Sequence, residues 1–253
     1  MAPTAFILVP GSFSPPLFFH KVSEQLRNKG HQVIETSLPT CVQDRETRPV
    51  PTLCDDVAML GETIKEWADK GYDVVLGMNS YGGFPGSESV KGYSKTERAQ
   101  NGLKGGVVGL AYLASFLPDI GESVASLLGE SMPDQLKNPQ SDFMELSKEG
   151  GGKWILNCLP EKDADYYMSK IGYHSRQSYL DSVSYSGWHT IPTWCLIPRD
   201  DYGVPPAVQK RMYERAAKQN RSLKLVEADG DHVPMLSNPD TVVSILLEAA
   251  GKA

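Results

Sequence analysis

The sequence predicts an α/β fold in which a mostly parallel sheet of about six strands has helices on both faces. Two observations support this prediction. Apolar segments of strand length alternate with helical patterns, and several of these segments are apolar throughout rather than at every second residue. A third observation is one long break in the alternation, between the fourth and fifth predicted strands. So long a departure is usually functional, and we expect it to form a helical cap over the sheet.

In the first half of the chain, strands are predicted over residues 6–9, 31–38, 74–78 and 105–114. Helices are predicted over residues 16–29 and 53–70, and a further helix from about residue 83. In the first helix Phe18, Phe19, Val22 and Leu26 recur at helical spacing. A helix with one apolar face packs against a sheet, so these segments fit the predicted layers.

The second half of the chain predicts strands over residues 193–197 and 223–227 and helices over residues 205–219 and 239–249. The break between the two halves covers residues 117–186 and scatters Leu, Met, Trp and Tyr without a steady period. We therefore expect residues 1–253 to form a single domain, with residues 117–186 as a cap insertion within it.

Composition narrows the range of partners. The chain has 253 residues, of which 40% are hydrophobic and 22% charged, so one ordinary packed core is available. The net charge is −6 and no run rich in Lys and Arg stands out, which argues against nucleic acid or a membrane as partner. The sequence leaves a homodimer open.

The predicted location is cytoplasmic, because the first residues lack a basic region and no segment approaches the roughly 20 apolar residues of a membrane helix. The four cysteines form no C-x-x-C pair and have no histidine at metal-ligand spacing. We expect reduced thiols, with Cys195 buried in a strand, and neither a metal nor a cofactor.

The stretch from Asp73 to Gly83 carries the strongest chemical signal. A strand-like apolar run ends at Ser80, glycines follow at once, and a helix comes next. This is the order of a nucleophile elbow, in which the residues two before and two after the serine are small. Gly82 meets this requirement, whereas Met78 stands where the first glycine is usual. We predict that Ser80 is a nucleophile.

A serine nucleophile needs a histidine base and an acid that orients the base. In this kind of fold the chain order is serine, acid, histidine. Asp200 and Asp201 follow the fifth predicted strand, and His232 follows the sixth in a loop of Gly and Asp. Spacing alone does not separate the two aspartates, of which one could instead pair with Arg199. The remaining histidines after the serine lie in or beside the cap and are expected to be surface or cap residues; they are His174 and His189.

An acyl-transfer site also needs two backbone N–H donors for the oxyanion. One is expected from Tyr81, directly after the serine, and one from Ser12, in the loop after the first strand, where Gly11 allows close approach. The apolar and aromatic content of the cap predicts an apolar or aromatic small-molecule substrate. The residues that we expect to contact substrate are Gly11, Phe13, Asn79, Met144 and Trp154.

On these residues the chain resembles the α/β-hydrolase superfamily, and more narrowly its small cofactor-free fungal branch, which is related to plant methyl esterases and hydroxynitrile lyases. The resemblance rests on residues 6–13, 73–86, 191–205 and 230–232. It implies the α/β-hydrolase fold, with Ser80 as nucleophile and His232 as base. It also implies oxyanion donors at Ser12 and Tyr81. In this group the acid stands four residues before the proline that opens the next helix, which points to Asp201.

The sequence departs from the pattern of this group at three places. Pro10 replaces a usual histidine, Asn79 replaces a histidine beside the nucleophile, and Met78, which also occurs among fungal members, replaces a glycine. Hydroxynitrile lyases carry a lysine just after the catalytic histidine, where Val233 stands here, so cyanohydrin cleavage is not expected.

The leading hypothesis is a serine hydrolase that cleaves a carboxylic ester or thioester through a Ser-His-Asp triad and an acyl-enzyme. A second hypothesis, motivated by Asn79, is a lyase, cyclase or acyltransferase of fungal secondary metabolism that uses the same site. A third is a non-catalytic protein that binds a small molecule under the cap.

Overall fold

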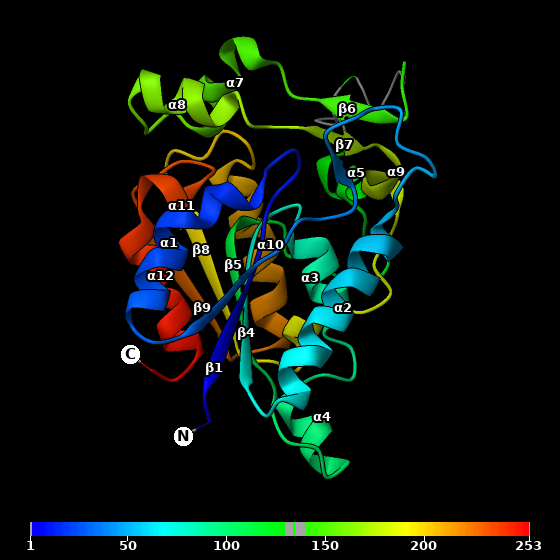
Figure 1. The fold of residues 1–253 in the computed structure, drawn as a ribbon, viewed down its shortest axis with the longest axis vertical. Helices are drawn as coiled ribbons and strands as arrows, with labels where there is room; N and C mark the ends of the chain where they lie inside the picture. The colour runs from blue at the N-terminus through cyan, green and yellow to red at the C-terminus, as the bar shows by residue number, and fades with distance from the viewer. Residues whose placement is uncertain (1, 130–133, 135–139, 253) are drawn as a thin grey trace.

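The computed structural model describes residues 2–129, 134 and 140–252. Its main feature is a six-stranded sheet with the order β2-β1-β4-β5-β8-β9, in which each neighbouring pair is parallel (Figure 1). The strands are β1 (Thr4–Val9), β2 (Gln32–Glu35), β4 (Asp73–Ser80), β5 (Gly106–Ser115), β8 (Thr193–Pro198) and β9 (Leu223–Ala228). The six predicted strands are thus confirmed.

Both faces of the four inner strands, β1, β4, β5 and β8, are buried, which explains why these strands carry continuous apolar runs. In β1, Phe6 and Leu8 pack into one hydrophobic cluster, while Ile7 and Val9 pack into a second cluster on the opposite face. Successive side chains of a strand point to opposite faces, so a strand covered twice needs apolar residues at every position.

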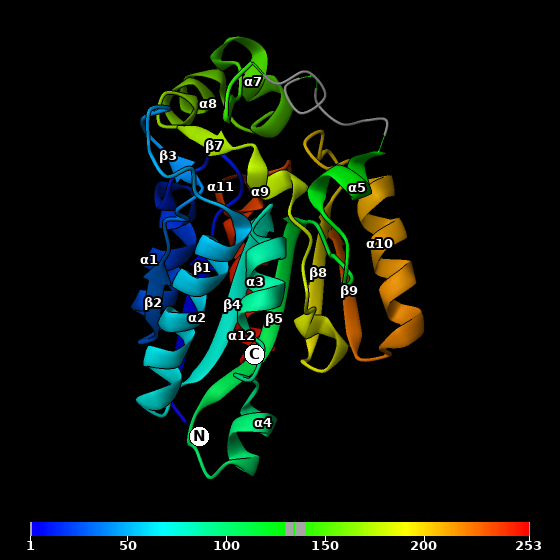
Figure 2. The same cartoon turned by 90° about the vertical axis from the view of Figure 1, so that its right-hand side faces the viewer.

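Helices form the two outer layers, as Figures 1 and 2 show. One face carries α1 (His20–Asn28), α11 (Pro234–Ser237) and α12 (Pro239–Ala249); the other carries α2 (Leu53–Asp69), α3 (Gly83–Ser89) and α10 (Pro206–Gln219). A short 3-10 turn, η1 (Pro16–Phe19), leads into α1, and α4 (Lys95–Gln100) precedes β5.

In the segment predicted as a cap, residues 117–186, the described helices and strands lie over the carboxyl ends of the strands of the large sheet, at the top of Figures 1 and 2. Its described elements are α5 (Val124–Leu128), β6 (Phe143–Glu145), α7 (Lys148–Ile155), α8 (Glu161–Met168), β7 (Tyr173–Ser175) and α9 (Gln177–Leu180), with η3 (Gly187–His189) just after it. Besides the expected helices, β6 and β7 join β3 (Cys41–Val42) in a small antiparallel sheet. The sequence did not predict this sheet, which ties the chain before α2 to the cap.

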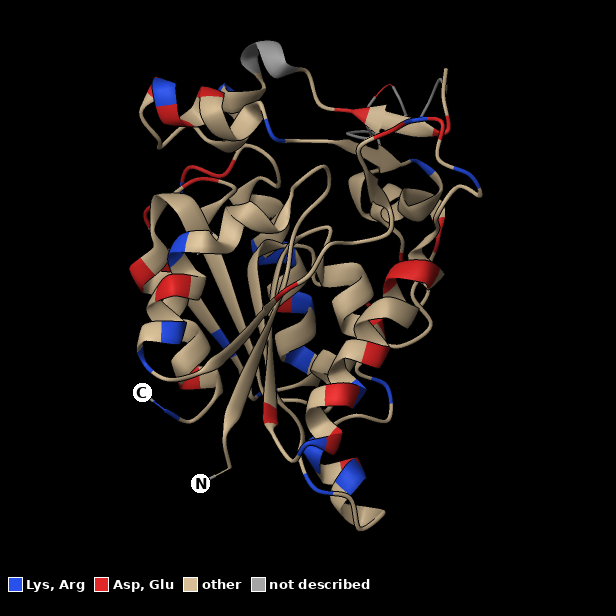
Figure 3. Cartoon of the chain, viewed as in Figure 1, with Lys and Arg blue, Asp and Glu red and all other residues tan. Residues whose placement is uncertain are grey.

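In the described part of the chain, charged residues lie mainly on the outer helices and the loops, and Lys and Arg are interspersed with Asp and Glu rather than gathered in one area (Figure 3). All four cysteines are free thiols, and Cys195 is buried in β8 as predicted. None of the helices in the described part of the chain is long and apolar enough to cross a membrane.

Candidate active site

Ser80 ends β4 in a left-handed backbone conformation, with φ of 52°. This conformation is strained for a residue with a side chain and is common at functional turns. The turn is closed by the N–H of Gly82, which donates to the carbonyl of Asn79 at 2.8 Å. A Cβ atom on Gly82 would lie 2.7 Å from the carbonyl oxygen of Pro10, so only glycine fits there. The predicted elbow geometry is therefore present.

Met78 fits the elbow because of a glycine on the following helix. Its side chain is fully buried, and a Cβ atom added to Gly86 of α3 would lie 2.3 Å from its sulfur. The space that a small residue would normally leave beside the nucleophile is here provided from the helix side. The departure from the usual motif is thus compensated locally.

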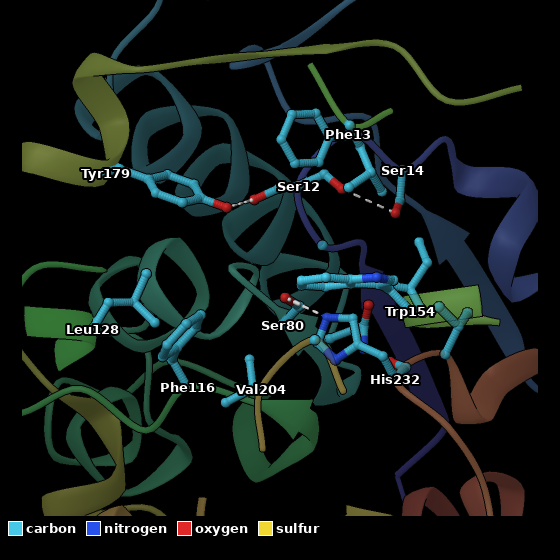
Figure 4. Close-up of a pocket in the computed structure, with 16 residues that line it drawn as sticks. Ser12, Phe13, Ser14, Ser80, Phe116, Leu128, Trp154, Tyr179, Val204 and His232 are labelled. Carbon is cyan, nitrogen blue, oxygen red and sulfur yellow. Dashed lines mark hydrogen bonds between the residues drawn. The ribbon is translucent and has the colours of Figure 1, made fainter. Parts of the chain in front are cut away.

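His232 and Asp201 complete a hydrogen-bonded chain with Ser80 (Figure 4). His232 Nε2 lies 2.9 Å from Ser80 Oγ, and His232 Nδ1 lies 2.9 Å from Asp201 Oδ1. Because a carboxylate only accepts hydrogen bonds, Nδ1 carries the proton and Nε2 offers its lone pair to the serine. This is the tautomer that a general base needs.

Burial opposes protonation of His232, but the charge of Asp201 and its hydrogen bond outweigh this, and the pKa of His232 is raised above 6.5. Asp201 is itself fully buried. Its Oδ1 accepts the N–H groups of Gly203 and Val204 at 2.8 and 2.9 Å, and its Oδ2 accepts Gln209 Nε2 at 2.7 Å. These neutral donors hold the carboxylate in place for the imidazole.

The loop after β8 also shapes the position of the imidazole. A Cβ atom on Gly203 would lie 2.5 Å from His232 Cγ, so the backbone of this loop lies directly against the ring. The structure separates the two aspartates: Asp201 faces His232, whereas Asp200 is exposed. Arg199 pairs with Asp229, so the alternative in which one of the two aspartates pairs with Arg199 does not hold.

The peptide groups that precede Tyr81 and Ser12 lie beside Ser80, and the carbonyl of each accepts hydrogen bonds. The carbonyl between Ser80 and Tyr81 accepts Ser115 Oγ at 2.8 Å and the N–H of Phe116 at 3.3 Å. The carbonyl between Gly11 and Ser12 accepts the N–H of Ser14 at 3.3 Å. A trans peptide points its N–H opposite to its carbonyl, so anchoring each carbonyl also fixes the direction of the N–H of Tyr81 and of Ser12.

The Gly11 loop lies close to the nucleophile. A Cβ atom on Gly11 would stand 2.8 Å from Ser80 Cβ and 2.9 Å from Asn79 Oδ1. Asn79 is buried, and its Nδ2 donates to the carbonyls of Leu113 and His232 at 2.9 and 3.0 Å. Asn79 therefore connects β4 to β5 and to the histidine loop.

A pocket of about 240 Å³ opens beside Ser80 and His232. In Figure 4 Trp154 lies over Ser80 and His232, while Phe116, Leu128 and Val204 form another wall. Its lining residues are Gly11, Ser12, Phe13, Ser14, Asn79, Ser80, Phe116, Leu128, Leu146, Trp154, Ile155, Tyr179, Gly203, Val204, His232 and Val233. Trp154 is 64% exposed, so it stands at the rim with its outer face in solvent.

Among the predicted substrate contacts, Gly11, Phe13, Asn79 and Trp154 line this pocket. Met144 does not line it. This residue belongs to β6, and its side chain is buried in the hydrophobic core. The prediction for Met144 was therefore wrong. Apolar character alone does not separate a pocket wall from a core position.

Several lining residues were missed. Phe116 directly follows β5, and Val204 and Val233 stand beside the predicted acid and base, so their places at the carboxyl edge of the sheet were a usable signal. Tyr179, which lines the pocket, and Gln209, which bonds to Asp201, had no such signal, because their approach depends on how the cap and α10 fold back. His174, predicted to be a surface or cap residue, lies in β7 of the cap and is fully buried.

The fold agrees with comparisons to known proteins. Residues 6–245 match the alpha/beta hydrolase family. The α/β hydrolase nvfD of Aspergillus novofumigatus is 29% identical over 255 residues, covering 100% of this chain and 99% of that protein. Methylesterase 7 of Arabidopsis thaliana is 24% identical over 264 residues, covering 98% and 96%. The structure of polyneuridine aldehyde esterase superposes with a TM-score of 0.78 at 19% identity, covering 98% and 99%. The chain thus belongs to the alpha/beta hydrolase family and is an enzyme of the hydrolase type.

Proposed function

We propose that the enzyme cleaves a carboxylic ester or thioester of an apolar small molecule through a Ser-His-Asp triad and an acyl-enzyme. The observation that carries this proposal is the hydrogen-bonded chain from Ser80 Oγ through His232 to Asp201, open to an apolar pocket. The strained elbow supports it, because it projects the serine hydroxyl beyond the end of the strand.

In the first half of the reaction, Ser80 Oγ attacks the acyl carbon while its proton moves to His232 Nε2. The N–H groups of Tyr81 and Ser12 hold the oxyanion that forms, and Asp201 stabilises the imidazolium. The bond from the acyl carbon to the leaving group then breaks, and His232 returns the proton to the leaving alcohol or thiol. The acyl group stays on Ser80.

In the second half, water attacks the acyl carbon and gives a proton to His232 Nε2. The bond to Ser80 Oγ breaks, the serine regains the proton, and a carboxylic acid leaves. The volume of the pocket beside Ser80, about 240 Å³, limits the size of the acyl groups that can be placed for attack by the serine.

The lining of the pocket supports a neutral substrate. None of the described residues that line it is Lys, Arg, Asp or Glu, so a charged acyl group would find no partner for its charge. One relative is named a methylesterase. A methyl ester of an uncharged aromatic or aliphatic acid is therefore the first substrate form to test.

The alternative is a lyase, cyclase or acyltransferase that uses the same site, and it is motivated by Asn79 beside the nucleophile. Asn79 lines the pocket, but its side-chain amide donates to two backbone carbonyls, which supports a structural role for this residue. A lyase or cyclase would also turn over without an acyl group on Ser80, which mass spectrometry of quenched enzyme distinguishes.

The test is turnover of activated aryl esters and labelling by a fluorophosphonate probe. Ser80→Ala should abolish both, because the nucleophile is gone. Ser89→Ala is the matched control, since Ser89 is a buried serine of α3 whose hydroxyl only donates to the carbonyl of Gly86. Labelling that persists in Ser80→Ala refutes the role of Ser80. Ligand binding without turnover in the native enzyme would favour a non-catalytic binding protein.

A further inference from the structure

A buried polar and aromatic cluster lies behind the two peptide groups that flank Ser80. The side chain of Tyr81 is fully buried and does not line the pocket. Its hydroxyl donates to Asp56 Oδ2 of α2 at 2.8 Å. The residue that offers one of the two N–H groups is therefore held at the far end of its ring by a carboxylate.

Asp56 has no role in the proposed mechanism, yet it is fully buried. Its other hydrogen bonds come from Thr40, whose N–H donates to Oδ1 at 3.0 Å and whose hydroxyl donates to Oδ2 at 2.7 Å. These donors are neutral, and burial raises the pKa of Asp56 to about 6. A buried carboxylate with only neutral partners lowers the stability of the folded protein. Proteins commonly keep such a residue where function needs it, which suggests a functional role for Asp56.

The second flanking residue, Ser12, is attached to the same cluster. Ser12 Oγ lies 2.6 Å from the hydroxyl of Tyr179 in α9 of the cap (Figure 4). The ring of Tyr179 stacks on the ring of Tyr81, with centroids 5.8 Å apart and planes inclined by 14°.

His174 closes this cluster from the cap. Its ring contacts Tyr81 edge-on at 4.5 Å and Tyr179 at 5.3 Å. Burial lowers the pKa of His174 to about 3, so the imidazole is neutral and packs as part of the aromatic stack. The cluster is thus continuous from Asp56 to Ser12.

We propose that Asp56, Tyr81 and Tyr179 form a positioning network that aligns both backbone N–H donors of the oxyanion hole. The inference rests on the proposed function, because it assigns a role to residues around that same site. The two N–H groups come from separate loops, one after β1 and one after β4. The stacked tyrosines connect these loops, with one end attached to Asp56 and the other to Ser12.

The network acts on the transition state rather than on substrate binding. An oxyanion donor helps only if it points at the place where the negative charge develops. Loss of a whole donor lowers kcat by about 10²–10³. Loosening one donor while keeping it present should cost less, about tenfold in kcat. Because the Tyr81 side chain does not line the pocket, KM should change by less than about twofold.

The decisive variants are Tyr81→Phe and Asp56→Asn, assayed for kcat and KM with an aryl ester. Tyr112→Phe is the matched control, since Tyr112 is also a buried tyrosine. Its hydroxyl lies 2.6 Å from Ser87 Oγ, and neither residue lines the pocket. We expect kcat to fall about tenfold in both network variants and to stay within about twofold in Tyr112→Phe. The double variant should fall little further than either single variant, because both changes alter the same hydrogen bond.

The outcomes separate this inference from the proposed function. If native enzyme turns over esters in a Ser80-dependent way but Tyr81→Phe has the same kcat as Tyr112→Phe, the positioning network is refuted and the hydrolase stands. A rise in KM at constant kcat would also refute it. If the native enzyme neither turns over esters nor labels at Ser80, the proposed function itself fails.

Discussion

The contact between Met78 and Gly86 makes a stringent test of how this elbow is built. A methyl group at Gly86 would lie 2.3 Å from the sulfur of Met78 and 2.8 Å from its Cγ. Carbon atoms in ordinary contact are about 3.5–4.0 Å apart, so the Met78 side chain would have to retreat within a fully buried site. Such overpacking costs about 1–3 kcal/mol, and the better helix propensity of alanine offsets up to about 1 kcal/mol of it.

Substitution of Met78, the other residue of this contact, leaves a cavity instead of a clash. Met78→Ala removes three heavy atoms from a packed core and should cost about 2–5 kcal/mol. In that background the obstruction to a methyl group at Gly86 is gone, and the methyl fills part of the cavity. Gly86→Ala should then be neutral or stabilising by about 1 kcal/mol. The two changes are therefore expected to couple by about 2 kcal/mol.

Denaturant unfolding of the four proteins, followed by circular dichroism, measures this coupling. Gly61→Ala is the control in both backgrounds, because a Cβ atom there meets only atoms at 3.9 and 4.0 Å. It should be additive with Met78→Ala. If Gly86→Ala costs the same free energy of unfolding with and without Met78, within about 0.5 kcal/mol, the explanation of the unusual elbow is refuted.

The remaining predictions concern the active site. The value of kcat/KM should rise with pH with a midpoint above 6.5, because His232 must be neutral to act as base and its pKa is raised. Asp201→Asn should lower that midpoint and reduce kcat by about 10⁴, and a pH profile left unchanged by it would contradict the assignment. Gly203→Ala should displace the His232 ring, since the added methyl would lie 2.5 Å from Cγ, and should reduce kcat about 10²-fold; native activity would contradict the close contact. Trp154→Ala should raise KM for apolar esters several-fold with little change in kcat, because the indole covers the pocket but holds no reacting atom, and a fall in kcat at constant KM would contradict this.

The fold was predictable because its signals are local and repeated. Strands such as β1 are buried on both faces and therefore read as unbroken apolar runs. The order of Ser80, Asp201 and His232 could also be predicted, since each stands at the end of a strand or just after one, and the carboxyl ends of parallel strands meet at one edge of the sheet. The resemblance to a known family then favoured Asp201 over its neighbour.

The cap was less predictable, for physical reasons. Strands β3, β6 and β7 have only two or three residues each, too few to show a period. The hydroxyl of Tyr179 bonds to Ser12, which lies 167 positions earlier in the chain, and no local sequence pattern predicts such a contact. Met144 shows the same limit in reverse, because its apolar side chain serves the core rather than the pocket.

Asn79 has a structural role that its place in the sequence did not reveal. Its place beside Ser80 predicted contact with substrate, and it does line the pocket, but its side-chain amide also has two backbone acceptors, the carbonyls of Leu113 and His232. A carbonyl oxygen only accepts, so the side-chain amide must present its nitrogen to both. A neutral imidazole carries one N–H and could satisfy only one of these carbonyls. The asparagine therefore fastens the loop that carries His232 to the strands that end beside it, through both carbonyls at once.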